Sequence, residues 1–203
     1  MTKKEEILLS TLDLASKYGL KSLSMSQIAE SVGIKKPSLY NHFRSKDELI
    51  QEMYGYIRNK SKQGVPDIPL ENIDALSAYD ILLGAVTNYK KLATSEYMLK
   101  FYSVIYSERT TNVAAAQILV EETNKMIAAT KELFGILKAK NKLCIEDIET
   151  AATAFSLTVH SLIDFELDCQ KSNQDFDKDN LRRYIKWFCD QHGKEDYEEQ
   201  KAN

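Results

Sequence analysis

A short stretch near the N-terminus, residues 35 to 46, gathers side chains that could contact a polyanion. Its charged, hydroxyl, amide and imidazole groups include those of Lys35, Lys36, Ser38, Tyr40, Asn41, His42, Arg44 and Lys46. Ammonium, guanidinium and hydroxyl groups suit phosphate oxygens, whereas amide and imidazole edges can form hydrogen bonds with bases. No acidic residue occurs between Glu30 and Asp47, so nothing along this stretch repels a phosphate backbone.

The charge of the chain is divided unevenly along its length. The formal net charge is -3, yet residues 1–62 hold 11 Lys and Arg against 7 Asp and Glu, whereas residues 63–203 hold 16 against 23. Only the N-terminal part therefore has the charge expected of a surface that meets a polyanion.

Two short helices, joined at Gly33, are expected to position these side chains. The first begins at Ser24, which forms a predicted capping box with Gln27, and the second begins near Lys36 and Pro37. Each has about two turns, too few to be stable alone, so the two must brace each other. Their inward residues are Ile28, Ala29, Val32, Leu39 and Phe43.

A helix, a tight turn and a second helix form the helix-turn-helix pattern, whose second helix can enter a DNA major groove. An ordinary solvated helical hairpin with surface lysines has the same composition. From composition alone, both interpretations stay open.

The order of residues in this segment resembles the DNA-binding domain of TetR-family transcriptional regulators over residues 5 to 50. The matching positions are Ser24, Ile28-Ala29, Gly33-Ile34, Leu39-Tyr40-Asn41-His42-Phe43, Ser45-Lys46 and Leu49. Lys35, Pro37 and Arg44 depart from the residues that are frequent in the family at those positions.

The resemblance implies contacts for particular residues of this chain. Tyr40, His42 and Lys46 would contact phosphates or the groove, and Ser26 and Gln27 would meet the backbone or a base edge. The readout surface would comprise Lys36, Pro37, Ser38 and Asn41, with the Lys35 ammonium group suited to phosphate.

Helical periodicity continues through the whole chain, with no convincing strand alternation. We therefore expect an all-α fold of about nine helices: a three-helix N-terminal helix-turn-helix domain followed by a helical-bundle domain for ligand binding and dimerisation. The expected domains are residues 1–62, including a connecting helix at 46–62, and residues 71–194, with a frayed tail at 195–203. Helices of the second domain are predicted near 71–93, 97–107, 111–140, 146–169 and 177–192.

Aromatic and other apolar residues in the second domain could line a pocket for a drug-sized molecule. The same residues could equally be plain core, since aromatic residues at helical spacing mostly fill space. The predicted ligand-binding residues are Tyr79, Tyr89, Phe101, Tyr102, Tyr106, Met126 and His160.

The last two predicted helices carry broad apolar faces, which suit a symmetric four-helix interface between two copies. The predicted interface residues are Phe155, Val159, Leu162, Ile163, Leu181, Tyr184, Ile185 and Phe188, with Trp187 beside them. A homodimer would double the short footprint of one recognition helix onto a palindromic operator.

Other kinds of chemistry find little support in the sequence. His160 and Asp164 lie four apart on one helix face, but no second histidine is near in sequence, so a hydrogen-bonded pair is favoured over a metal site. The widely spaced Cys144, Cys169 and Cys189 fit reduced thiols. No catalytic or nucleotide-binding motif was found, nor an apolar run long enough to span a membrane, so we expect a cytoplasmic protein that is not an enzyme and has no cofactor.

These observations predict a dimeric DNA-binding transcriptional regulator, a repressor that releases its operator when a small molecule binds. The alternative is a protein-protein adaptor of TetR-like shape that does not read DNA. Retention of Tyr40, His42 and Lys46 argues against the adaptor, which has no need of a phosphate-binding set.

Overall fold

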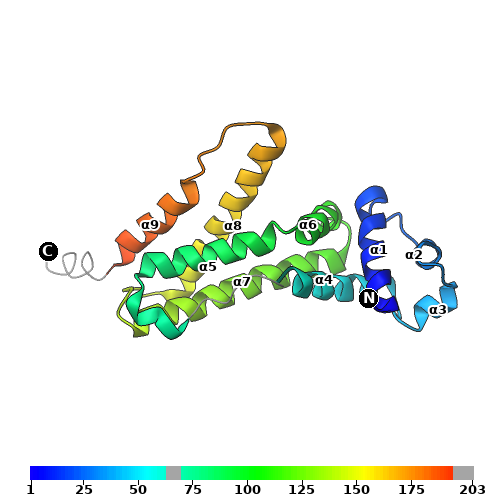
Figure 1. Ribbon diagram of the computed structural model, residues 1–203, viewed down its shortest axis with the longest axis horizontal. Coiled ribbons are helices and arrows are strands. Elements are labelled where there is room, and N and C mark those ends of the chain that lie inside the picture. Colours follow the sequence, from blue (N-terminus) through cyan, green and yellow to red (C-terminus); the bar gives the residue numbers. More distant parts are fainter. Residues whose placement is uncertain (63–69, 194–203) are drawn as a thin grey trace. The chain divides into compact units, whose positions relative to one another are not determined.

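The computed structural model describes residues 1–62 and 70–193, and every regular element within them is helical (Figure 1). This confirms the predicted all-α fold. The helices are α1 (Lys3–Tyr18), α2 (Met25–Ser31), α3 (Lys36–Tyr40), α4 (Lys46–Lys62), α5 (Ala78–Ala93), α6 (Glu96–Glu108), α7 (Val113–Ala139), α8 (Ile148–Ser172) and α9 (Asn180–His192), with a 3-10 turn, η1 (Leu70–Ala75). The tail predicted to fray, residues 195–203, lies outside the described residues.

The helix predicted at 71–93 is divided in the structure. The 3-10 turn η1 comes first, and α5 starts only at Ala78. Ser77 explains the new start, because its hydroxyl oxygen accepts the backbone N–H of Asp80 at 3.1 Å and so satisfies a donor of the first turn. None of the described helices combines the length and the apolar composition that a membrane span requires.

The chain folds as two compact units. Of the described residues, the first unit contains 1–62 and 91–122, and the second contains 70–90 and 123–193. Helix α6 and the first part of α7 therefore pack with the N-terminal helices, because α6 contacts both α1 and α4. The predicted domain division, residues 1–62 against 71–194, stays a prediction.

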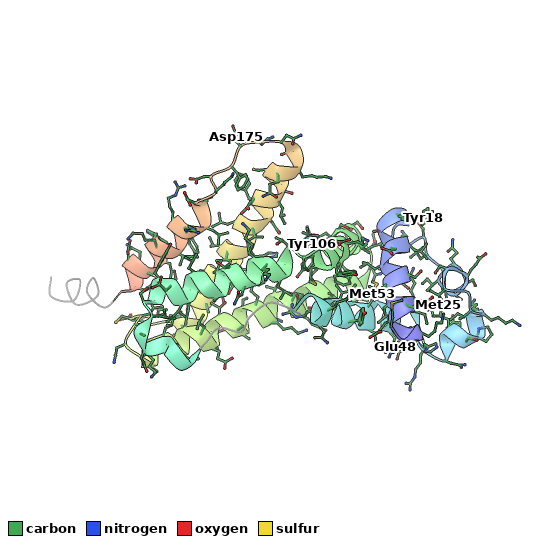
Figure 2. The ribbon with its side chains drawn as sticks, in the orientation of Figure 1. Tyr18, Met25, Glu48, Met53, Tyr106 and Asp175 are labelled. Atoms are coloured by element: carbon green, nitrogen blue, oxygen red, sulfur yellow. The ribbon has the colours of Figure 1, made fainter. Side chains whose placement is uncertain are left out.

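The core of the first unit is formed where α1 packs against α2, α4 and α6. Figure 2 shows the side chains of this unit, with Met25 of α2 and Met53 of α4 labelled. Removal of these apolar side chains from water stabilises short helices that could not persist alone. Side chains with no exposed surface include Ile7, Leu20, Ile28, Leu39, Phe43, Leu49, Ile57 and Phe101.

The core of the second unit centres on three phenylalanine rings, one from each of α7, α8 and α9. The ring centroids of Phe134 and Phe155 are 5.4 Å apart, and those of Phe155 and Phe188 are 4.8 Å apart. Such spacings are typical of favourable aromatic pairs. Helices α8 and α9 run antiparallel and pack against each other (Figure 1).

Candidate nucleic-acid interface

Helix α2 begins with the predicted capping box. The Ser24 hydroxyl oxygen accepts the backbone N–H of Gln27 at 3.2 Å, and the Gln27 side-chain oxygen accepts the backbone N–H of Ser24 at 2.9 Å. The Gln27 oxygen is therefore used within the helix, while its amide nitrogen keeps donors for a ligand. Ser26 and Gln27 are both exposed.

The turn after α2 requires Gly33. Its φ of +68° is in the left-handed region that glycine adopts without strain. The backbone N–H of Gly33 donates to the Glu30 carbonyl at 3.0 Å, and that of Ile34 donates to the Ala29 carbonyl at 3.0 Å. These bonds close the end of α2 and direct the chain into α3.

Helix α3 is short and is anchored by apolar residues. Leu39 and Phe43 have no exposed surface, which fixes one side of α3 and the following turn against the core of the first unit. Lys35 occupies the cap position without a side-chain hydrogen bond, and Pro37 lies in the first turn, where its missing N–H costs nothing.

The other side of α3 carries the predicted DNA contacts, and every one of them from residue 35 to 42 is exposed. We call this set the α3 surface: Lys35, Lys36, Pro37, Ser38, Tyr40, Asn41 and His42. The Lys36 ammonium lies 6.0 Å from the centre of the Tyr40 ring. The α3 surface therefore presents two cations, hydroxyl groups, an amide and an imidazole from one short segment.

Lys46, the remaining predicted contact, points elsewhere. Its ammonium donates hydrogen bonds to the backbone carbonyl oxygens of Leu20, at 2.5 Å, and Leu23, at 2.8 Å. Burial lowers the pKa of Lys46, and the Glu108 carboxylate acts in the opposite direction. Its ammonium group is thus already engaged within the first unit, and a phosphate contact by Lys46 stays a prediction.

The predicted ligand-binding residues are distributed over both units. Phe101, Tyr102 and Tyr106 belong to the first unit, where Phe101 is fully buried and the Tyr102 and Tyr106 rings stack at 5.6 Å. The second unit contains Tyr79, Tyr89, Met126 and His160.

Tyr89 and His160 lie together in the second unit. The Tyr89 hydroxyl and His160 Nδ1 share a hydrogen bond of 2.9 Å, and His160 Nε2 lies 3.5 Å from an Asp164 carboxylate oxygen. Burial raises the pKa of Asp164, while His160 acts to lower it. Within the described residues, no three His, Cys, Asp or Glu side chains group as metal ligands would, and His160 and Asp164 are only two.

Most of the predicted dimer-interface residues are covered within the single chain. Phe155, Val159, Ile163, Ile185 and Phe188 are buried in the core of the second unit, while Leu162, Leu181 and Tyr184 are half-buried. The large apolar side chains left in contact with water on these helices are Leu157, Phe165 and Trp187, which are 44%, 55% and 55% exposed. Leu157 was absent from the predicted apolar face.

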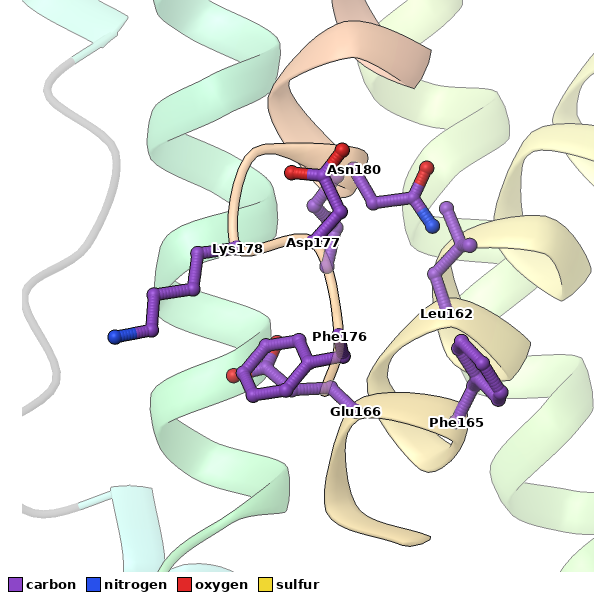
Figure 3. A pocket seen from close by; sticks show the side chains of 8 residues that line it. Leu162, Phe165, Glu166, Phe176, Asp177, Lys178 and Asn180 are labelled. Carbon is purple, nitrogen blue, oxygen red and sulfur yellow. The ribbon is translucent and has the colours of Figure 1, made fainter. Parts of the chain in front are cut away.

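A small pocket adjoins this face at the turn between α8 and α9. Figure 3 shows three of its lining residues, Phe165 and Glu166 from α8 and Phe176 from the turn. The lining also includes Leu162, Asp177, Lys178, Asn180 and Leu181. Glu166 and Asp177 form ion pairs with Lys90 and Arg183, so these carboxylates already have cationic partners.

The comparison with known proteins agrees with this geometry. Residues 7–53 match the model of a family described as bacterial regulatory proteins, tetR family. The HTH-type transcriptional repressor KstR2 of Mycolicibacterium smegmatis is 35% identical over 52 residues, which are 26% of this chain. The chain thus matches about a quarter of the length of that relative, 25%.

Solved structures resemble the chain over nearly its whole length. The flavonoid-responsive regulator FrrA has a TM-score of 0.74 at 20% identity, with 95% of this chain and 97% of that chain covered. A TetR-family transcriptional regulator from Agrobacterium tumefaciens has a TM-score of 0.62 at 17% identity, with 94% and 97% covered. Residues 7–53 therefore match the N-terminal domain of the tetR family of bacterial regulatory proteins, and the fold of the chain resembles that of these solved structures.

Proposed function

We propose that this protein is a sequence-specific DNA-binding transcriptional regulator that acts as a homodimer in the cytoplasm. The α3 surface is the observation that carries the proposal. Its side chains are exposed and do not pack in the core, and they belong to a short segment that Leu39 and Phe43 anchor to the core. A helix-turn-helix of this kind presents its second helix to the major groove.

The expected division of labour follows from the chemistry of each group. Lys35, Lys36 and the Tyr40 hydroxyl neutralise or contact phosphates, which fixes the protein on the duplex. Ser38, Asn41 and His42 offer groups that can form hydrogen bonds with base edges. Ser26 and the Gln27 amide nitrogen on α2 add contacts at the flank.

Dimerisation would give this small surface enough sequence to read. One five-residue helix, α3, reaches only a few base pairs, whereas two copies related by a two-fold axis read a palindrome. The exposed Leu157, Phe165 and Trp187 support an interface on α8 and α9, because large apolar side chains in water are costly. Half-buried Leu162, Leu181 and Tyr184 would complete it.

A small-molecule effector completes the proposal. The solved relative FrrA is described as flavonoid-responsive, which supports the idea of an effector without naming one for this chain. Tyr89 and His160 form a polar pair among apolar neighbours and could orient such a molecule by hydrogen bonds. Binding would favour one arrangement of the dimer and thereby release a palindromic operator, as a repressor does.

Selection of fragmented source-genome DNA on the purified protein tests the proposal, with Tyr40→Ala as the parallel variant. We expect the wild type alone to enrich one palindromic motif, because Tyr40 is exposed and its loss leaves the fold intact. If wild type and variant retain the same fragments, the α3 surface does not read DNA. If the wild type enriches none with or without cell metabolites, a protein-protein adaptor is favoured.

A further inference from the structure

A buried carboxylate lies at the end of α6. Among the residues that the structure describes, Glu108 is the only charged one that is buried, with 6% of its surface exposed. An ionised carboxylate loses its hydration on burial and is tolerated only when hydrogen-bond donors or cations replace the water. The contacts of Glu108 therefore identify what this position does.

Glu108 holds the turn between α1 and α2. Its Oε1 atom accepts a hydrogen bond from the backbone N–H of Lys21 at 2.8 Å. On the other side, its backbone carbonyl accepts the N–H groups of Thr111 and Asn112, both at 2.9 Å, where the chain turns from α6 into α7. One residue thus connects the α6–α7 corner to the N-terminal helices.

Lys46 holds the same turn from the opposite side. Its ammonium binds the carbonyl oxygens of Leu20 and Leu23, while Glu108 binds the intervening N–H of Lys21. We call these contacts of Glu108 and Lys46 on residues 20–23 the clasp. Glu108 belongs to α6 and Lys46 to α4, so the clasp links these two helices through the turn. All of its donors and acceptors belong to the first unit.

The clasp holds both ends of the helix-turn-helix pair. Residues 20–23 lead directly into the capping box of α2 at Ser24, and Lys46 starts α4 only a few residues after α3 ends at Tyr40. The orientation of α3 relative to α6 is therefore constrained where the chain enters the motif and where it leaves.

We propose that Glu108 is a positioning residue for DNA recognition, which holds the α1–α2 turn and so keeps α3 in the orientation that binds the operator. This inference rests on the proposed function. The side-chain hydrogen bond of Glu108 is to Lys21, so in this proposal Glu108 acts through the turn. Without it, α3 samples several orientations, and the apparent affinity falls in proportion to the fraction that remains competent.

Two variants remove the contacts of the Glu108 side chain in part or in full. Glu108→Gln keeps an oxygen that can accept the Lys21 N–H but removes the charge that faces Lys46, and Glu108→Leu removes both. The matched control is Asp13→Asn. Asp13 of α1 pairs with Lys100 of α6 at 2.7 Å, so this variant also removes a carboxylate that connects α1 and α6. Unlike Glu108, Asp13 lies on the exposed surface.

Operator affinity is measured by fluorescence anisotropy well below the thermal midpoint of each variant, together with affinity for random DNA. We expect Glu108→Leu to bind the operator roughly tenfold more weakly, Glu108→Gln to fall between, and Asp13→Asn to match the wild type. Random DNA, which needs no exact orientation, is bound about equally by all. If the Glu108 variants acted only by removing a negative charge, they would bind DNA more tightly than the wild type, which is the opposite of the expected result.

Amide hydrogen exchange at Lys21 separates the possible failures. Faster exchange in Glu108→Leu, with weaker operator binding and unchanged affinity for random DNA, supports the proposal. Operator affinity within twofold of wild type in both Glu108 variants overturns it, as does an equal loss on both kinds of DNA. A wild type that binds no DNA overturns the proposed function, and this inference with it, whatever Lys21 does.

Discussion

The ammonium group of Lys46 lies 2.8 Å from the backbone carbonyl oxygen of Leu23, so this lysine points into the fold. The family pattern had suggested a phosphate contact at this position. A phosphate contact and a structural contact make different predictions, because only the former releases a counterion from DNA.

We predict that Lys46→Met weakens operator binding without changing its salt dependence. The loss follows from the released turn, since hydrogen bonds to charged groups stabilise a fold by about 1.5–3 kcal/mol each. The measurement is the slope of log affinity against log salt, with Lys36→Ala as the exposed comparison. Lys36→Ala should reduce the slope by about 0.9, the value for one lost phosphate contact. A reduction of that size in Lys46→Met would restore the phosphate role.

Gly33→Ala should lower the free energy of unfolding by about 1–2 kcal/mol, the cost of the left-handed conformation for a residue with a Cβ. The cost comes from the φ of +68°. It does not come from a steric clash, since an added Cβ would meet no atom within 4 Å. Asparagine tolerates this conformation better, so Gly33→Asn should lose less. Urea denaturation of the three proteins checks the order, and equal stability of all three would show that the turn relaxes.

Arg58→Met should lower the free energy of unfolding by about 3 kcal/mol, because it leaves a largely covered carboxylate without its cation. Arg58 of α4 pairs with Glu122 of α7, whose side chain is only 10% exposed and also accepts the Tyr102 hydroxyl at 3.1 Å. Replacing both charged partners, in Arg58→Met with Glu122→Met, should recover most of the loss. Thermal and urea unfolding test this, and a double variant less stable than Arg58→Met would contradict it.

Stability should fall more steeply on mild acidification in the wild type than in His192→Gln. Burial lowers the pKa of His192, whose ring packs 4.5 Å from that of Phe188, below its ordinary 6.5. The unfolded chain then binds the proton first, so the stabilisation present above pH 6.5 is lost as the pH falls through the lowered pKa. Urea midpoints from pH 8 to pH 5 test this. Parallel curves for the two proteins would exclude a contribution from His192.

Phe165→Glu should convert the proposed homodimer to a monomer, because it adds a charge to the exposed apolar face of α8. Val113→Glu is the control, since Val113 is also exposed, at 74%, but lies at the start of α7. Analytical ultracentrifugation gives the mass of each. Dimers that persist in Phe165→Glu would assign the interface to another surface, and a monomeric Val113→Glu would point to α7.

The sequence predicted local structure better than it predicted which surfaces face inward. The Ser24 capping box and the glycine turn follow from residues a few positions apart, and both were found where expected. In contrast, α8 and α9 have apolar residues on more than one side, and periodicity cannot tell the chain's own core from a partner. Phe155 and Phe188 were therefore assigned to an interface, although they pack on each other.

Long-range contacts lay beyond the sequence. Nothing near Lys46 reveals that its ammonium would find the carbonyls of Leu20 and Leu23, 26 and 23 residues earlier. The pairing of Glu108 with Lys21, 87 residues apart, was equally hidden. The likeness to a family gave the expected contacts of its motif, and the structure distinguishes those that stay exposed.

In α3 the residues that stabilise the fold differ from those proposed to contact DNA. Its stability depends on Leu39 and Phe43, which are fully buried, while Lys36, Pro37, Ser38 and Asn41 are exposed and support no core. Substitutions at these four positions would cost the fold little. If the α3 surface contacts DNA as proposed, an exchange of these few side chains would change the preferred DNA sequence while the stability of the helix is kept.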